Sequence, residues 1–294
     1  MGKGEPLFLR ESALLEIQSV WSLPHSESDL GTAAHTAPVV VELADLQQAL
    51  QRCEIRLHFQ PIVSLQDGRA AGLEGHLTWQ DPVRGIRPAS SLVTVADAHG
   101  LAPALVRTQV EQACSLVRAL NPDPLVAGPM FVALNVSARH LADPSMTQDV
   151  LAVVRRTGIN PALLVLELNE LAGVAGRNAT KEALRSLRAA GVRVALDHFG
   201  GDDSSVLDLR ELPVTEVKID EDLVPSVDST NGGLPIVAGL VQLVHGLGLL
   251  CAADGVEAAA QANALRGVGC DLAQGPYWGP ALPEAEAVAR LLGR

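Results

Sequence analysis

Seven polar or charged residues follow short apolar runs in this 294-residue chain, each at or next to the end of its run. They are four carboxylates, two amides and one amine: Glu74, Asn135, Glu167, Asp197, Lys218, Asp254 and Gln274. These side chains converge on one pocket only if the runs are parallel strands that close into a ring. Mg²⁺ and Mn²⁺ prefer a hard, oxygen-rich site. Such a site would then be formed by three carboxylates and one amide, namely those of Glu74, Glu167, Asp197 and Asn135.

The chemistry that this ring predicts is that of phosphoryl groups. A divalent cation polarises a phosphoryl oxygen, and a pair of cations also activates water for in-line attack. Lys218 would place an ammonium near the attacking water or the developing charge, and Asp254 stands where a base could act. A single acidic residue at a strand end is more often a helix cap or a solvated loop charge. Seven polar strand ends in one ring are hard to explain in that way.

Strands and helices alternate along most of the chain. Strand-like apolar runs cover residues 56–63, 70–79, 130–136, 163–168, 193–199, 215–219, 247–253 and 270–275. Helical apolar spacing covers residues 42–52 and the intervals near 102–119, 145–157, 178–190, 204–211, 234–246, 256–266 and 283–292. The turn Gln66-Asp67-Gly68 joins the first two runs as a hairpin, so the first strand runs antiparallel to the second. We therefore predict an α/β fold, a TIM-like (β/α)8 barrel with an antiparallel first strand, formed by one domain over residues 41–294.

The composition restricts the class of ligand. A net charge of −12 and a pI near 5.1 argue against long nucleic acids, because an acidic surface repels their phosphates. A small anion held by local groups or bridging metals remains compatible with this charge. The four cysteines are scattered and form no zinc motif. No apolar stretch is long enough to cross a membrane and no apolar signal core opens the chain, so a cytoplasmic protein is expected.

Residues 1–40 differ in composition from the rest and are predicted to form an N-terminal extension and linker. Residues 11–21 have the spacing of a short amphipathic helix, and residues 24–38 are rich in Ser, His, Thr and Ala. Two interpretations stay open. The segment is either a tail with one docked helix or an arm that mediates dimerisation or binds a partner.

A series of short motifs resembles the EAL-domain family, which comprises bacterial phosphodiesterases and receptors for cyclic di-GMP. The resemblance extends over residues 42–290. In chain order the motifs are Phe59-Gln60-Pro61-Ile62-Val63, Glu74-Gly75-His76, Asn135-Val136-Ser137, Glu167-Leu168-Asn169-Glu170, Val217-Lys218-Ile219-Asp220, Asp254-Gly255-Val256-Glu257 and Ala273-Gln274-Gly275. Each motif alone is weak, but their common order and spacing are specific to that family. The antiparallel first strand also fits its barrel.

The resemblance implies a role for each matching residue. The first metal would be held by Glu74, Asn135, Glu167 and Asp197, and His198 occupies the position of a ligand of the second metal. Lys218 would lie beside the catalytic water, and Glu170 would anchor the loop after Asp197. The positions implied to contact substrate or support the site are Gln60, Pro61, Thr78, Asp220 and Gln274.

The chain departs from the family pattern where the chemistry lies. The family has a second aspartate at His198, and an imidazole suits Mg²⁺ poorly and brings no negative charge. Thr78 stands in place of a phosphate-contacting arginine, a loss of about 1.5–3 kcal/mol, or roughly ten- to a hundredfold in affinity. Asp254 replaces a glutamate, which withdraws the carboxylate from the second metal and the water. His76 replaces the leucine of the family's namesake motif.

Two further aspartates, Asp202 and Asp203, add negative charge to the loop that organises the second metal in the family. Close to a bound phosphate they would repel it unless a cation intervened, whereas pointing to solvent they would have little effect. Together these departures predict that the second metal site is lost, that affinity for cyclic di-GMP is weakened and that hydrolysis is very slow or absent.

Three functions therefore remain in competition. The leading hypothesis is a degenerate EAL-type domain that serves signalling through nucleotide sensing, protein contact or both. The second is an active phosphodiesterase that depends on Mg²⁺ or Mn²⁺ and opens cyclic di-GMP to linear pGpG. The third is an interaction module that binds no nucleotide. A protein partner is expected under the first and third hypotheses, and the resemblance also implies a homodimer.

Overall fold

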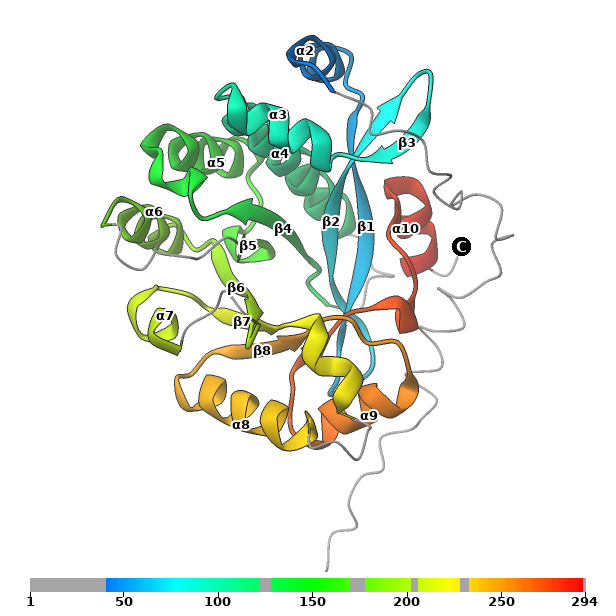
Figure 1. Ribbon diagram of the computed structural model, residues 1–294, viewed down its shortest axis with the longest axis vertical. Coiled ribbons are helices and arrows are strands. Elements are labelled where there is room, and N and C mark those ends of the chain that lie inside the picture. Colours follow the sequence, from blue (N-terminus) through cyan, green and yellow to red (C-terminus); the bar gives the residue numbers. More distant parts are fainter. Residues whose placement is uncertain (1–40, 122–127, 170–177, 202–205, 228–232, 293–294) are drawn as a thin grey trace, which may run out of the picture.

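The computed structural model describes residues 41–121, 128–169, 178–201, 206–227 and 233–292. Within these ranges the strands are arranged around a centre and the helices lie outside them (Figure 1). The predicted N-terminal extension and linker, residues 1–40, lies outside the described residues. So do three residues that the sequence singled out, namely Glu170, Asp202 and Asp203.

Eight of the described strands close the barrel in the order β1-β9-β8-β7-β6-β5-β4-β2, and β2 pairs back with β1. Their bounds are β1 Ile55–Ser64, β2 Ala70–Asp81, β4 Phe131–Ser137, β5 Leu164–Asn169, β6 Arg193–Phe199, β7 Glu216–Ile219, β8 Leu250–Ala253 and β9 Leu272–Ala273. Strand β1 runs antiparallel to both neighbours, whereas the pairs from β2 round to β9 are parallel. The predicted TIM-like barrel with an antiparallel first strand is confirmed.

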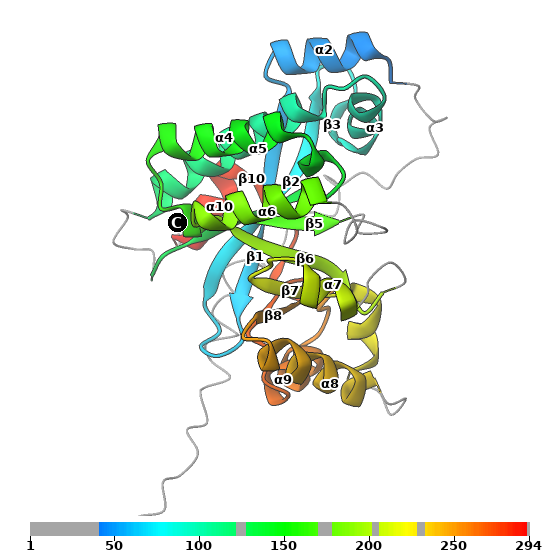
Figure 2. The ribbon, with the colours of Figure 1, turned by 90° about the vertical axis from the view of Figure 1, so that its left-hand side faces the viewer.

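Helices cover the outside of the barrel and connect successive parallel strands, as crossover connections require. Their bounds are α2 Leu43–Gln51, α3 Ser90–Ala98, α4 Ala102–Leu120, α5 Pro144–Thr157, α6 Asn178–Ala189, α7 Val206–Glu211, α8 Gly233–Gly246, α9 Ala259–Gly267 and α10 Glu284–Leu291. Figure 2 shows α2, α3 and β3 grouped at one end of the molecule, beyond the barrel strands. No helix in the described ranges combines the length and apolarity needed to span a bilayer.

The sequence pattern missed α3 and two short strands, β3 (Gly85–Pro88) and β10 (Leu282–Pro283). The strands are too short to show a period. Helix α3 contains two valines and a threonine, which are poor helix formers, and it is stabilised instead by packing. Its Leu92 and Ala96 are buried in a small cluster with Leu46 of α2 and Trp79 of β2.

One predicted strand is also shorter than expected. Strand β8 begins at Leu250 and not at residue 247. Gly248, with φ +73°, turns the chain after α8 in a left-handed conformation that glycine adopts readily. The backbone N–H of Leu249 then donates to the carbonyl of Val244, which completes the helix end and delays the strand.

Side chains alternate along the barrel strands between the helices and the lumen. The face toward the helices carries large aliphatic side chains and forms the main core. The lumen instead holds a small cluster composed of Ile62, Phe131, Ala133, Val165 and Ala195. Because Ala133 lies beside Glu74 in register and Ala195 lies beside Glu167, small side chains leave room for the carboxylates.

Gly72 of β2 is required by this packing. A Cβ at this position would lie 2.6 Å from the Phe131 ring, which is far closer than carbon atoms approach without a shift. Phe131 is buried in the lumen, and the guanidinium carbon of Arg193 lies 4.5 Å from its ring centroid. The aromatic ring therefore has little freedom to move aside.

We expect Gly72→Ala to destabilise the fold by about 1–3 kcal/mol, because the added methyl overpacks the lumen. Urea denaturation measures the loss. The double variant Gly72→Ala/Phe131→Leu should lose less than the sum of the two single changes, since leucine removes the clashing ring atoms. An unchanged midpoint for the single variant would contradict the argument.

Candidate active site at the barrel mouth

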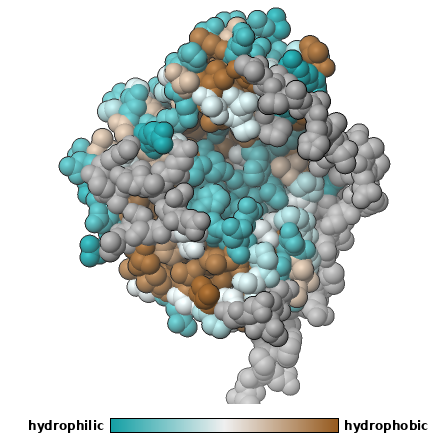
Figure 3. All heavy atoms as spheres, viewed as in Figure 1, coloured by the Kyte–Doolittle hydropathy of each residue, from teal (hydrophilic) through white to brown (hydrophobic). Residues whose placement is uncertain are grey.

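Barrel closure brings seven of the predicted residues into one connected set of hydrogen bonds and ion pairs. They are Gln60, Glu74, Asn135, Glu167, Lys218, Asp254 and Gln274. Asn135, Glu167 and Lys218 lie toward the carboxyl ends of parallel strands, and Asp254 and Gln274 directly follow such strands, where barrel enzymes place their functional groups. Glu74 lies near the end of the part of β2 that pairs with β4. Hydrophilic side chains occupy the centre of this face of the molecule (Figure 3).

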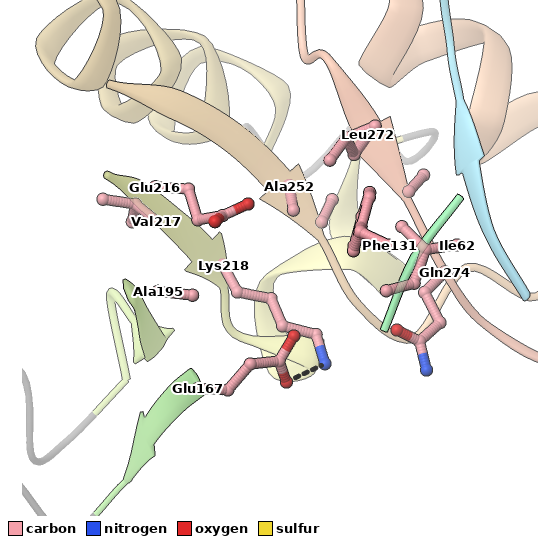
Figure 4. Close-up of a pocket in the computed structure, with 12 residues that line it drawn as sticks. Ile62, Phe131, Glu167, Ala195, Glu216, Val217, Lys218, Ala252, Leu272 and Gln274 are labelled. Carbon is pink, nitrogen blue, oxygen red and sulfur yellow. Dashed lines mark hydrogen bonds and ion pairs between the residues drawn. The ribbon is translucent and has the colours of Figure 1, made fainter. Parts of the chain in front are cut away.

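The ammonium of Lys218 is the centre of this cluster. Its Nζ lies 2.8 Å from Glu74 Oε2, 3.3 Å from Glu167 Oε2 and 2.9 Å from Asp254 Oδ2. Lys218 is 4% exposed, so these interactions act with little screening by solvent. Figure 4 shows Glu167 and Lys218 pointing toward each other across the lumen. One cation thus neutralises part of the charge of three carboxylates.

The carboxylates differ in their affinity for protons. Burial acts to raise the pKa of Glu74, but Lys218, His76 and the hydrogen bonds from Lys218 and Gln274 lower it to about 2. Burial raises the pKa of Glu167 well above its ordinary value, which Lys218 offsets only in part, and Glu74 and Asp197 raise it further. Burial likewise raises the pKa of Asp197. Glu74 is therefore the ionised partner of Lys218, and Glu167 is the carboxyl that most readily keeps a proton.

Two amides hold Glu74 from the other side. Gln274 Nε2 donates to Glu74 Oε2 at 2.7 Å and to Gln60 Oε1 at 2.9 Å. Asn135 Nδ2 donates to Glu74 Oε1 at 2.5 Å. Gln60 is itself fixed, because its Nε2 donates to the carbonyl of Gly279 at 3.0 Å. Glu74, deeply buried, thus has partners on both oxygens.

The backbone after Gln274 must be a glycine for this arrangement to form. Gly275 has φ +151°, and a Cβ there would collide with the backbone N and O of Val256. The close approach lets the N–H of Val256 donate to the carbonyl of Gln274 at 3.0 Å. This bond fixes the direction in which the Gln274 side chain enters the mouth.

Asn169 is a site residue to which the sequence analysis assigned no role. Its Nδ2 donates to Asn135 Oδ1 at 3.4 Å and so helps to orient the Asn135 amide. It follows Glu167 by two residues on β5, and residues two apart on a strand share a face. That spacing was the available signal.

His198 lies at a distorted point of β6. Its φ is +54°, which is uncommon for a residue other than glycine, and the pairing with β7 shifts register between Leu196 and Phe199. The imidazole is half-exposed and lies between two carboxylates. Nδ1 is 3.2 Å from Asp220 Oδ2, and Nε2 is 3.5 Å from Asp197 Oδ2. The structure thus joins three predicted residues, with the imidazole bridging the carboxylates.

Two predicted residues lie apart from both the cluster around Lys218 and the group of Asp197, His198 and Asp220. Thr78 is farther along β2, and its Oγ1 donates to the carbonyl of Arg56 on β1 at 3.0 Å. Pro61 pairs in register with Leu73, so strand alternation places it on the opposite face of β1 from Gln60. The structure places Gln60 at the cluster and Pro61 behind it.

A small cavity lies in the lumen beneath the cluster. Its volume of about 20 Å³ is enough to hold one water molecule. Glu167, Lys218 and Gln274 border it, as does Glu216, whose Oε2 accepts a hydrogen bond from Arg193 at 2.6 Å. Burial raises the pKa of Glu216, although Arg193 opposes this. The Arg193–Glu216 pair closes the lumen on the side away from the mouth.

The donor set fits one hard cation by its chemistry, with three carboxylates and one amide on successive strands. In the described residues, no three imidazole, thiol or carboxylate groups converge at metal-ligand spacing. Lys218 lies among these carboxylates, and its ammonium takes up charge that a cation would otherwise balance. The amide nitrogen of Asn135 also faces Glu74, and a half-turn of that amide would present its oxygen instead.

Comparison with known proteins identifies the family. The model of the EAL domain matches residues 43–281, most of the chain. The chain belongs to the EAL-domain family. MucR of Pseudomonas aeruginosa, a bifunctional diguanylate cyclase/cyclic di-GMP phosphodiesterase, is 32% identical over 247 residues, which are 84% of this chain and 36% of MucR. NbdA of the same organism, a cyclic di-GMP phosphodiesterase, is 30% identical over 243 residues, 82% of this chain and 30% of NbdA.

The chain spans about a third of the length of these curated relatives. Among solved structures, the MucR phosphodiesterase in complex with c-di-GMP matches this EAL domain with a TM-score of 0.74 at 31% identity. The match covers 83% of this chain and 98% of that one. EAL domains are typically dependent on Mg²⁺ or Mn²⁺. The cluster around Glu74 is the part of this domain whose donors suit such an ion.

We expect Lys218→Met to destabilise the domain by about 3–5 kcal/mol at neutral pH, because buried carboxylates lose their counter-charge. The loss should be larger near pH 8 than near pH 5. Burial raises the pKa of Glu167 and of Asp197 in the folded state. A carboxyl of this kind contributes fully to the stability of the fold below its unfolded-state pKa. That contribution is lost as the pH rises through the folded-state pKa. Urea denaturation at the two pH values measures both effects.

The matched control is Lys181→Met, which removes an ion pair to Glu211 on the outside of the barrel. It should change stability by less than about 1 kcal/mol. Equal losses for the two variants, or a Lys218→Met loss that does not depend on pH, would contradict the central role of Lys218.

Proposed function

We propose that this domain is a degenerate EAL-type module in cyclic di-GMP signalling, which senses the nucleotide, contacts a protein partner or does both, with hydrolysis impaired or lost. The observation that carries the proposal is the position of the His198 imidazole. An imidazole stands between Asp197 and Asp220 where the family pattern has a carboxylate for the second metal. It reduces the negative charge available to a second divalent cation and lies within contact distance of both remaining carboxylates.

Asp254 supports the same proposal. One of its oxygens lies 2.9 Å from the Lys218 ammonium, and the other accepts a hydrogen bond from the Gly255 N–H at 2.7 Å. Both partners hold its short side chain in place, which disfavours a further contact with a second cation. An error of about 1 Å at a reacting centre can lower a rate roughly a hundredfold.

The donor atoms of four residues would hold one Mg²⁺ or Mn²⁺ ion, namely Glu74, Asn135, Glu167 and Asp197. That ion would polarise a phosphoryl oxygen. Other side chains of the site would position the donors and balance the charge. Gln274 and Asn135 hold Glu74 in place by hydrogen bonds, and the Lys218 ammonium would supply positive charge to a phosphate bound beside it. Binding without turnover is the outcome that this arrangement favours.

The alternative is an active phosphodiesterase that produces pGpG. It is favoured by Glu74, Asn135, Glu167 and Lys218, which lie in one cluster, and by Asp197, which interacts electrostatically with Lys218 and Glu74 and completes the first donor set. The similarity to MucR over 84% of the chain also supports it. The two proposals make opposite predictions for turnover under identical conditions.

We expect calorimetry to detect binding of cyclic di-GMP in Mg²⁺ or Mn²⁺, while chromatography of the reaction detects little or no pGpG. Turnover should rise in the variant Thr78→Arg/His198→Asp/Asp254→Glu, which restores the expected charge around the phosphate. Linear product at ordinary enzyme rates of about 1–1,000 s⁻¹ from the natural sequence, abolished by Glu74→Ala, would establish the alternative. Absence of heat at high micromolar nucleotide would leave only the protein-contact role.

We also propose that the domain forms a homodimer through α8. The residues Ile236, Gly239, Leu240 and Leu243 have the spacing of one helix face. Ile236 is 56% exposed, and a Cβ at Gly239 would meet no other atom. Apolar side chains gather over α8 in Figure 3. A second copy supplies the same stripe, and the small glycine allows two helices to approach closely.

We expect Ile236→Glu to shift the protein from dimer to monomer, since a charge at the centre of an apolar interface is left unpaired. Light scattering coupled to size-exclusion chromatography measures the mass. Val83→Glu is the matched control, because Val83 is 87% exposed in a turn far from α8 along the chain. A natural protein that is monomeric at high micromolar concentration would refute the interface.

A further inference from the structure

One amide oxygen in the barrel lumen accepts no hydrogen bond from any residue that the structure describes. It is Oε1 of Gln274, which is shielded from solvent in a side chain that is 2% exposed. The nitrogen of the same amide is fully used, because it donates to Gln60 Oε1 and to Glu74 Oε2. A buried acceptor without a donor destabilises the fold, so this oxygen requires a donor.

Reversing the Gln274 amide would not satisfy this oxygen. It would then face Gln60 Oε1 and Glu74 Oε2, and both of these atoms are acceptors. The Gln60 amide cannot reverse in compensation, because its Nε2 already donates to the carbonyl of Gly279. The donor for Gln274 Oε1 must therefore come from the lumen side.

The small lumen cavity lies on that side of Gln274. Its polar border near Gln274 is formed by Glu167 and Lys218. Figure 4 shows the Gln274 oxygen on the side that faces these two residues, and the nitrogen turned away from them. A donor in the cavity can therefore reach Gln274 Oε1. Apolar side chains form much of the remaining wall, among them those of Ile62, Phe131, Ala195 and Leu272.

Volume and charge together restrict the ligand of this cavity. About 20 Å³ holds one water molecule and nothing larger. A small cation would be repelled by the buried Lys218 ammonium, and a small anion by the carboxylates of Glu74 and Glu167. Water is neutral and donates two hydrogen bonds, which matches acceptor oxygens on Gln274 and Glu167.

We propose that the lumen binds one water molecule, which donates to Gln274 Oε1 and to the carboxyl group of Glu167. This water keeps the amide oxygen of Gln274 in the lumen and its nitrogen on Glu74 and Gln60. It is thus a positioning group for Gln274, and through Gln274 for Glu74. The water site does not depend on whether the domain binds or hydrolyses a nucleotide.

A high-resolution crystal structure of the full chain tests the site directly. We expect one density peak at about 2.5–3.0 Å from Gln274 Oε1 and at a similar distance from a Glu167 oxygen, the range of O–H···O hydrogen bonds. A cavity without density would overturn the proposal. A peak at about 2.0–2.1 Å from the Glu167 oxygen would also overturn it, because that distance indicates Mg²⁺.

The positioning role is tested in solution with Ala252→Val, which extends a side chain that lines the cavity and displaces the water. Cys251→Val is the matched control, because Cys251 is the preceding residue of β8 and packs in the main core toward the helices. NMR records the side-chain amide of Gln274. We expect Ala252→Val to shift its resonances and to speed exchange of its protons with solvent, and Cys251→Val to change neither.

The direction of the exchange effect separates the two explanations. A valine that only improves packing would slow the exchange, whereas loss of the water frees the amide and speeds it. Unchanged or slower exchange in Ala252→Val would overturn the positioning role. If Ala252→Val does not fold, the density beside Gln274 in the natural protein decides the proposal.

Discussion

The structure depends on one ammonium held among three carboxylates inside the barrel mouth. Charges of one sign repel strongly when little water separates them, so Glu74, Glu167 and Asp254 require Lys218 between them. This requirement explains the rest of the local architecture. Small lumen residues such as Ala133 leave space for the carboxylates, and Gly275 lets the chain turn so that Gln274 reaches Glu74.

The ion pairs of Lys218 also limit which further groups the carboxylates can bind. A carboxylate that is bound to Lys218 and to a backbone N–H has little freedom to bind a second ion, and this is the situation of Asp254. His198 adds a nitrogen donor where another carboxylate would have increased the repulsion. Under the proposed function, these two residues are also the positions at which the second metal site has lost its ligands.

The direction of β1 determines which residues border the mouth. In a barrel with eight parallel strands, the residues before a strand lie at the closed end. Because β1 is antiparallel, its amino-terminal half, with Arg56 and His58, lies at the open end beside the long β2 strand. An entirely parallel arrangement would have placed Arg56 and His58 on the opposite side of the barrel.

The sequence by itself determined the barrel, the direction of its first strand and the set of polar residues at the mouth. Apolar periodicity and one hairpin turn are local signals, and the order of the motifs is a property of the chain. The sequence did not determine that Asn169 orients Asn135, that α3 packs on Trp79, or that His198 lies between Asp197 and Asp220. Those features depend on register shifts, left-handed backbone and contacts between distant segments. Only the tertiary structure decides these features, because the contacts that stabilise them join residues that are far apart in the sequence.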